Sequence, residues 1–278
     1  MKKFILLKII SMITDNEFKE LSKYIYDNIG IHLPEGKKPL VQTRLNKRLK
    51  SLKLKNYTDY INYLKSPNSS EELIMLTNEI STNVTHFFRE NNHFDFLKKY
   101  IYDNKNKKEI KIWSSACSSG EEPYSIAIHF FEVIKKNNLK VDFKILASDI
   151  SEEILEKASN GQYTFEDVKN MPKDLLLRYF DEKQEGIYQI KSFVKDKIIF
   201  REFNLVYGDY SKIKDFTFDL IFCRNVMIYF DPETKTNVSN KLINKVKREG
   251  VFFIGQTESL VNKCNDIKCL APSIYLKN

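Results

Sequence analysis

The sequence predicts an α/β fold with a doubly wound, mostly parallel sheet, joined to an all-helical N-terminal domain and interrupted by a small inserted β hairpin subdomain. Apolar residues recur at helical spacing from Thr14 to about Lys65, and strand and helix patterns alternate after Lys108. Phe218–Cys223 and Val251–Ile254 are short apolar runs of the kind found in the middle of parallel sheets. We therefore expect an N-terminal extension at residues 1–13, the helical domain at 14–80, and the α/β domain at 81–278 with its insert at about 171–200.

The composition is that of a folded, intracellular protein. Charged residues make up 29% of the 278 residues and hydrophobic residues 42%, unlike a disordered chain. The net charge of +8 favours acidic partners, although the chain is rich in lysine throughout and a coding bias would produce the same excess. Four cysteines do not make a disulfide framework, and the spacing of Cys264 and Cys269 does not suit zinc, so we expect buried free thiols, no bound metal and a cytoplasmic location. The opening apolar run is broken by Lys8 and no apolar segment is long enough to span a bilayer, so we expect no membrane insertion.

The helical domain combines an apolar stripe with a basic one. Phe18, Leu21 and Ile25 share one face of a first helix that starts near Thr14. After a break at residues 30–39, a helix over 40–55 is expected, and a further helix over 71–80. In the second helix the apolar stripe is Val41, Leu45, Leu49 and Leu52, and the neighbouring basic stripe is Arg44, Lys47, Arg48 and Lys55.

The stretch STNVTHFFRE, residues 81–90, places many hydrogen-bonding side chains beside two aromatic residues, Phe87 and Phe88. The alternative interpretation is an ordinary helix start, in which Thr85 is the N-cap and Glu90 lies in the early turns.

The α/β pattern begins with a strand at Glu109–Ser114, a helix at Glu121–Asn137 and a second strand at Val141–Ser148 that ends at Asp149. Pro172–Phe180 is expected to be helical, and the polar stretch after it, with alternating apolar residues around Gly186, is typical of a hairpin.

The loop after the first strand predicts the type of cofactor. It contains a single glycine, Gly120, followed by Glu121 and Glu122. A dinucleotide site requires several glycines, and these carboxylates would repel a diphosphate, but they suit the cationic cofactor S-adenosylmethionine. Asp149 ends the next strand, where a carboxylate can accept hydrogen bonds from both ribose hydroxyls. The alternative is that these carboxylates are ordinary helix caps.

A third polar group follows the strand in FDLIFCRNVMIYF. Polar side chains after a buried strand usually face a pocket, so Asn225 is a candidate cofactor ligand and Tyr229 a candidate for the methyl-transfer site. The alternative is a packed turn in which Asn225 makes only local hydrogen bonds.

Together, TNVTHFFRE, SSGEEPYSIA, ASDIS, FNL, IFCRNVMIYFD and GQTESL resemble the chemotaxis receptor methyltransferase (CheR) family, from about Ile13 to Leu276. The resemblance implies a class I, Rossmann-like methyltransferase that converts S-adenosylmethionine to S-adenosylhomocysteine and forms methyl esters on glutamates of the cytoplasmic domain of chemoreceptors. It implies cofactor contacts from Asn83, Thr85, Arg89, Gly120, Glu122, Asp149, Asn204, Leu205, Asn225 and Val226, with Arg89 and Tyr229 nearest the methyl group. Arg89 could also be a structural partner of Glu122 or Asp149.

By the same resemblance, Arg44, Lys47, Arg48 and Lys50 form the receptor-docking face. The run Asp181–Gly186 is shorter than in relatives that grip a receptor peptide, so we expect direct recognition of the methylation helices by a monomer. The open alternatives are a methyltransferase acting on nucleic acid or a small molecule, and a non-enzymatic module that binds receptors or senses the cofactor. We expect no nucleic-acid partner, because residues 224–230 are not an Asn/Asp-Pro-Pro-aromatic loop of the kind that would resemble base amino-group methyltransferases.

Overall fold

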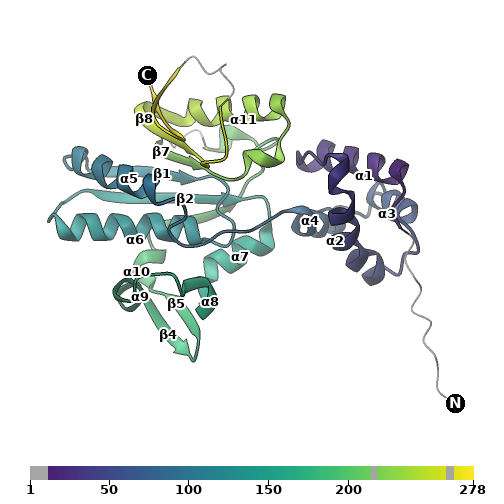
Figure 1. Ribbon diagram of the computed structural model, residues 1–278, viewed down its shortest axis with the longest axis horizontal. Coiled ribbons are helices and arrows are strands. Elements are labelled where there is room, and N and C mark those ends of the chain that lie inside the picture. The colour runs from purple at the N-terminus through teal and green to yellow at the C-terminus, as the bar shows by residue number, and fades with distance from the viewer. Residues whose placement is uncertain (1–11, 214–217, 261–265) are drawn as a thin grey trace. The chain divides into compact units, whose positions relative to one another are not determined.

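The computed structural model describes residues 12–213, 218–260 and 266–278, and it divides into two compact units at residues 82 and 83 (Figure 1). The expected extension at 1–13 therefore lies almost wholly outside the described residues, as does Cys264. Among the described cysteines, Cys117 and Cys223 are buried free thiols, whereas Cys269 is exposed, so the expectation of burial is wrong for Cys269. No helix among the described residues is long and apolar enough to cross a bilayer.

The first unit consists of helices. They are α1 (Asp15–Ile29), the short 3-10 helix η1 (Glu35–Lys37), α2 (Lys38–Ser51), α3 (Tyr57–Leu64) and α4 (Ser70–Ile80). Thr14 and Glu17 form a reciprocal capping box at the start of α1, and Gly30 ends this helix in the left-handed conformation at φ 90°. The predicted apolar stripes form the core of this unit, with Leu21, Leu45 and Leu49 fully buried.

The second unit is built on a sheet of seven described strands in the order β6-β2-β1-β7-β8-β10-β9. The strands are β1 (Glu109–Ser114), β2 (Asp142–Asp149), β6 (Ile198–Glu202), β7 (Phe218–Cys223), β8 (Val246–Ile254), β9 (Ile267–Ala271) and β10 (Ile274–Lys277). The first five are parallel, whereas β10 and β9 run antiparallel at one edge. Because β2 and β7 lie on opposite sides of β1, the order of the strands reverses at β1, and open α/β sheets bind ligands at the carboxyl ends of the strands beside such a point.

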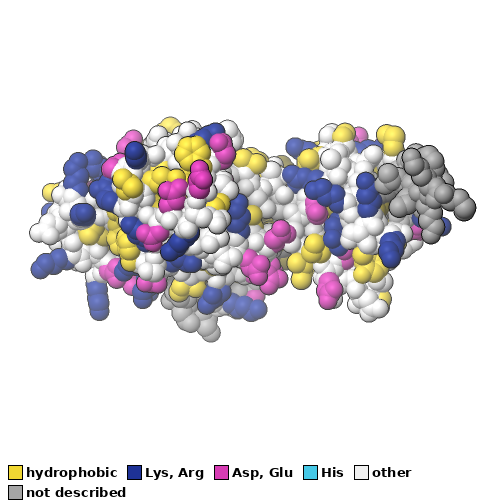
Figure 2. All heavy atoms as spheres, turned by 90° about the horizontal axis from the view of Figure 1, so that it is seen from below, with side chains coloured by type: hydrophobic (Ala, Val, Ile, Leu, Met, Phe, Trp, Pro, Cys, Tyr) yellow, Lys and Arg dark blue, Asp and Glu magenta, His cyan; other side chains and the backbone are white. Residues whose placement is uncertain are grey.

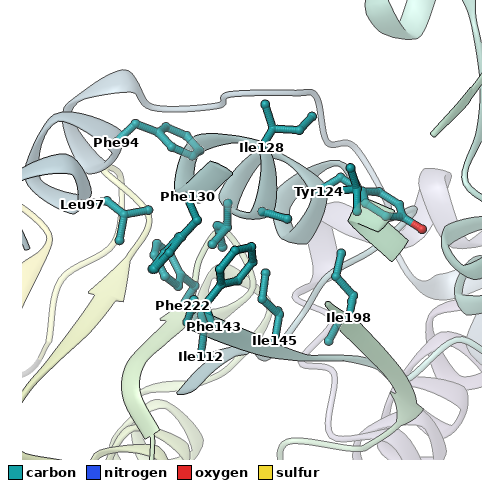
Figure 3. Close-up of a cluster of buried hydrophobic side chains, with 14 of the residues drawn as sticks. Phe94, Leu97, Ile112, Tyr124, Ile128, Phe130, Phe143, Ile145, Ile198 and Phe222 are labelled. Atoms are coloured by element: carbon teal, nitrogen blue, oxygen red, sulfur yellow. The ribbon is translucent and has the colours of Figure 1, made fainter. Parts of the chain in front are cut away.

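Apolar clusters cover both faces of this sheet. On one face, α5 (Asn91–Asp103) and α6 (Glu121–Lys136) pack on alternate strand residues such as Ile112, Phe143 and Phe222, as Figure 3 shows. On the other face, α11 (Pro232–Lys245) packs on Trp113 and Phe252. Helix α7 (Glu152–Asn160) follows β2, and the single turns α10 (Ser192–Lys195), η2 (Tyr210–Ile213) and η3 (Met227–Tyr229) complete the unit. The predicted fold class is confirmed.

The insert has one strand more than the expected hairpin. It comprises β3 (Gln162–Thr164), α8 (Phe165–Val168), α9 (Lys173–Tyr179), β4 (Phe180–Gln184) and β5 (Ile187–Ile190), with the antiparallel strand order β3-β5-β4. Gly186 turns the chain between β4 and β5 at φ 74°. The small sheet therefore begins with β3, before the predicted insert at about residue 171.

Candidate cofactor site

The loop after β1 is fixed between the two neighbouring strands. The Ser115 amide donates to the Phe222 carbonyl at 2.8 Å and the Cys117 amide to the Ser148 carbonyl at 2.9 Å. Gly120 enters α6 at φ 95°, and a Cβ there would come within 2.9 Å of the Tyr163 hydroxyl. Tyr163 also donates its hydroxyl to the Ser119 carbonyl at 2.8 Å. The close approach of Tyr163 and the positive φ thus both require a glycine at position 120.

Asp149 lies at the carboxyl end of β2 and faces this loop. Its two carboxylate oxygens accept from the Ser118 amide at 2.8 Å and the Ser151 amide at 3.2 Å, and the residue is only 8% exposed. Burial raises the pKa of Asp149 above the ordinary carboxyl range, against the lowering effect of these hydrogen bonds. A carboxylate offers about four acceptor positions, so two amides leave capacity for hydroxyl donors of a ligand.

Glu122, in the first turn of α6, is paired with Arg224, which no sequence pattern marked as its partner. It accepts from the Ser114 hydroxyl at 2.7 Å and from the Arg224 guanidinium at 2.9 Å. Burial raises the pKa of Glu122, and the charge of Arg224 opposes that rise. Among the described residues, the arginine that pairs with Glu122 is therefore Arg224 and not Arg89.

Arg224 also reaches the segment of residues 81–90. It donates to the Arg89 carbonyl, and its guanidinium lies 3.2 Å from the Glu90 carboxylate. The side chain of Arg224 is 2% exposed, so one buried cation lies between two carboxylates. Burial and the charge of Arg224 lower the pKa of the adjacent His93 to about 4, so His93 is neutral near pH 7 and adds no positive charge. With Asp149, the acidic groups outnumber the buried cation, which suits a cationic ligand.

Residues 81–90 form an irregular, sharply bent segment. Phe88 and Glu90 have positive φ values of 55° and 65°, and the Phe88 amide donates to the Ser125 hydroxyl at 2.9 Å. Phe87 packs edge-on against the ring of Tyr163 with centroids 4.8 Å apart. Each left-handed residue costs about 1–3 kcal/mol and persists only where its surroundings hold it. The alternative helix start at Thr85 is wrong, because α5 begins at Asn91.

The same segment carries three of the predicted cofactor residues. The Asn83 carbonyl accepts from the Ser118 hydroxyl at 3.1 Å, which places the segment against the loop after β1. Thr85 and Arg89 are half-buried. The Arg89 guanidinium donates to the Val84 carbonyl at 3.0 Å, and the ion pairs found among the described residues include none to Arg89.

The remaining candidates follow two other strands. The Phe203 amide donates to the Asp149 carbonyl at 2.8 Å, which brings Asn204 and Leu205 to the end of β2. The Asn204 side-chain oxygen accepts from the amides of Val206 and Tyr207, so it holds a tight turn. After β7, Asn225 adopts a left-handed conformation, Val226 follows it, and Tyr229 ends η3 half-buried.

Two of the four predicted docking residues are held within the helical unit. Arg44 donates to the carbonyls of Glu79, Ile80 and Ser81 at the end of α4, at 2.7–3.1 Å. Arg48 forms a two-pronged ion pair with Glu72, whose side chain is 2% exposed. Lys47 and Lys50 are exposed. On the face that Figure 2 shows, lysine and arginine side chains are spread over both units with acidic side chains between them.

The fold and the site define a class of protein. A parallel sheet carries a glycine-bearing loop after its central strand. Beside that loop lie the buried carboxylate of Asp149 and the partly buried carboxylate of Glu122, whose side chain is 12% exposed, and this arrangement is typical of a domain that binds a cationic nucleoside cofactor.

Comparison with known proteins identifies the family. Residues 83–275 match the model of the CheR methyltransferase SAM binding domain, and residues 16–81 match that of the CheR methyltransferase all-alpha domain. The chain belongs to the CheR methyltransferase family and is an S-adenosylmethionine-dependent methyltransferase. The predicted family, fold class and cofactor are confirmed.

Curated relatives match over nearly the whole chain. A chemotaxis protein methyltransferase of Borreliella burgdorferi is 41% identical over 96% of this chain and 95% of its own length. Its counterpart in Escherichia coli is 36% identical over 89% of this chain and 85% of its own. Chemotaxis protein methyltransferase 2 of Pseudomonas aeruginosa is 34% identical over 94% and 93%.

Proposed function

We propose that this protein transfers a methyl group from S-adenosylmethionine to glutamate side chains in the cytoplasmic domain of bacterial chemoreceptors. The products are glutamyl methyl esters and S-adenosylhomocysteine, and the protein acts as a cytoplasmic monomer. The observation that carries the proposal is the near full-length similarity to chemotaxis protein methyltransferases, together with the partly buried carboxylate of Glu122 and the buried carboxylate of Asp149.

The proposed chemistry requires positioning rather than proton transfer. S-adenosylmethionine, when bound, supplies an electrophilic methyl group on a positively charged sulfur. A receptor glutamate with an ordinary pKa of about 4.3 is already ionised at neutral pH, so no general base is needed. Holding the two reactants in line and excluding water can contribute roughly 7–11 kcal/mol.

The residues of this chain would divide that task. Asp149 accepts hydrogen bonds from ribose hydroxyls, and Arg89 orients the carboxylate of the substrate, because its guanidinium is bound only to the Val84 carbonyl among the contacts described above. In this proposal, Tyr229 and Arg89 are the residues nearest the methyl group that is transferred. Further cofactor contacts in this proposal come from Asn83, Thr85, Gly120, Glu122, Asn204, Leu205, Asn225 and Val226.

Receptor docking falls to the exposed lysines of α2. Lys47 and Lys50 are free of the structural contacts that hold Arg44 and Arg48, so they can meet the acidic surface of a receptor helix. We propose that the docking face is centred on Lys47 and Lys50, with Arg44 and Arg48 as its structural support.

A labelling experiment tests the proposed function. The purified protein is incubated with S-adenosylmethionine carrying a labelled methyl group and with membranes that contain chemoreceptors. The proposal expects label on the receptor that alkali releases as methanol, since methyl esters are base-labile. A parallel incubation contains DNA in place of the membranes. Alkali-stable label on that DNA, or tight cofactor binding without any label on the receptor, would refute the proposed function.

A further inference from the structure

The stretch GQTESL after β8 has no part in the chemistry proposed above, yet its glutamate faces the backbone of the cofactor site. One oxygen of the Glu258 carboxylate accepts from the Asn225 amide at 2.9 Å and from the Gly255 amide at 2.7 Å. The other oxygen accepts from the Met227 amide at 2.7 Å. A single carboxylate therefore joins the chain just after β7 to the chain just after β8, through hydrogen bonds of the stronger, charge-assisted kind.

The chain at Asn225 needs such support because of its conformation. Asn225 has a φ of 57°, in the left-handed region that costs free energy for a residue with a side chain. Gly255 allows the end of β8 to approach it, since a Cβ on Gly255 would lie 2.6 Å from the Asn225 side-chain nitrogen. From the other side, Glu90 accepts from that nitrogen at 3.3 Å and from the Gln256 amide at 3.2 Å. Two carboxylates thus hold Asn225 in place.

We propose that Glu258 is a positioning residue for methyl transfer. Through the amides of Asn225 and Met227 it fixes the backbone that presents Asn225, Val226 and Tyr229, without touching the cofactor itself. Loss of the carboxylate would leave these amides without their acceptor and allow the left-handed residue to relax, so the cofactor would bind a less ordered strand end. This inference rests on the cofactor site of the proposed function.

A glutamine at this position separates shape from acceptor capacity. Glu258→Gln keeps the size of the side chain but replaces one oxygen with an NH2 group, which is a donor only. Because both carboxylate oxygens accept from amides, either orientation of the new side chain places a donor against at least one backbone N–H. Glu258→Gln is therefore expected to fold and to impair binding less than Glu258→Ala.

Asp219 offers a matched control at the opposite end of β7. Its carboxylate is 1% exposed and accepts from the Lys111 amide at 2.9 Å. It also pairs with Lys107 and Lys247, each at 2.8 Å. Asp219→Asn thus removes a comparable set of charge-assisted contacts at the start of the strand and leaves its carboxyl end unchanged.

Calorimetric titration of the full chain with S-adenosylhomocysteine, alongside thermal unfolding, tests the proposal. Glu258→Gln is expected to raise the Kd for S-adenosylhomocysteine about tenfold, which corresponds to the loss of roughly one charge-assisted hydrogen bond. Glu258→Ala is expected to raise this Kd further. Asp219→Asn is expected to lower the Tm at least as much as Glu258→Gln while its Kd stays within about twofold of the unmutated value.

The outcomes are distinct. A Kd for Glu258→Gln equal to that of the unmutated protein would overturn the inference, whether or not Glu258→Ala folds. An equal rise in Kd for Asp219→Asn would also overturn it, because general destabilisation would then explain both. If the unmutated protein binds S-adenosylhomocysteine but methylates no receptor, the proposed function fails, and the comparison of the two Kd values still decides the role of Glu258.

Discussion

Replacing two neighbouring residues of α2, Arg48 and Lys47, separates what holds the helical unit together from what meets a receptor. The Arg48 guanidinium lies 3.0 Å and 2.5 Å from the two oxygens of Glu72, with side chains 15% and 2% exposed. Breaking a buried ion pair typically costs about 3–5 kcal/mol. We take the lower end, because Arg48 keeps some exposure and the Tyr60 hydroxyl still donates to Glu72 at 2.7 Å.

The expected effect of Arg48→Ala is therefore a loss of about 3 kcal/mol, which is roughly a hundredfold increase in the equilibrium for opening the helical unit. Lys47→Ala, at an exposed position, should change stability by less than about 0.5 kcal/mol. In contrast, Lys47→Ala should raise the receptor concentration needed for half-maximal methylation, because it removes a docking charge without disturbing the helices.

Amide hydrogen exchange measured by mass spectrometry on peptides from α2 and α4 provides the assay, with methylation kinetics measured in parallel. Arg48→Ala should accelerate exchange in both helices, and neither variant should alter the Kd for S-adenosylhomocysteine, since the cofactor residues lie in residues 83–278. Unchanged exchange in Arg48→Ala would refute the structural role given to Arg48. Faster exchange in Lys47→Ala would show that this pair does not separate the two roles.

Three further predictions concern the cofactor site. Asp149→Ala should weaken binding of S-adenosylhomocysteine at least about tenfold in calorimetry, since it removes the acceptor for ribose hydroxyls, and an unchanged Kd would contradict that role. Burial raises the pKa of Asp149 and Glu122, so protonation should begin to compete with binding as the pH falls, at a pH above the ordinary carboxyl range; a Kd that stays constant down to about pH 4 would exclude this. Gly120→Ala should lower the Tm, because its φ of 95° strains any side chain and its Cβ would approach the Tyr163 hydroxyl to 2.9 Å; an unchanged Tm would show that the loop adapts freely.

Strand positions were predictable where burial makes a continuous apolar run. β1 and β7 have the predicted bounds because both are central strands covered on both faces. The beginning of β8 was missed, since Lys247, Arg248 and Glu249 are not buried and break the apolar pattern before Val251. The strand β3 was also missed, because three residues with one buried side chain carry no pattern of their own and depend on pairing with β5.

The sequence predicts which segments meet at the site. It does not predict which charged side chains form ion pairs there. Glu122 and Asp149 stand at strand ends that the parallel topology brings together. Which arginine neutralises Glu122 depends on a contact between residues 102 positions apart, and no local pattern distinguishes Arg224 from Arg89. The structural contacts of Arg44 and Arg48 could not be predicted for the same reason. A basic stripe has the same sequence pattern whether its side chains face solvent or bind a neighbouring helix.

The aromatic contacts of Tyr163 limit how freely the insert can be exchanged among relatives. This residue belongs to β3, yet its ring packs on Phe87 and its hydroxyl supports the Ser119 carbonyl in the loop before α6. A chimera that grafts another protein's insert here would also rebuild one wall of that loop. Grafts that retain a tyrosine at this position should be compatible with the host domain, whereas grafts that omit it would require compensating changes at Phe87 and Gly120.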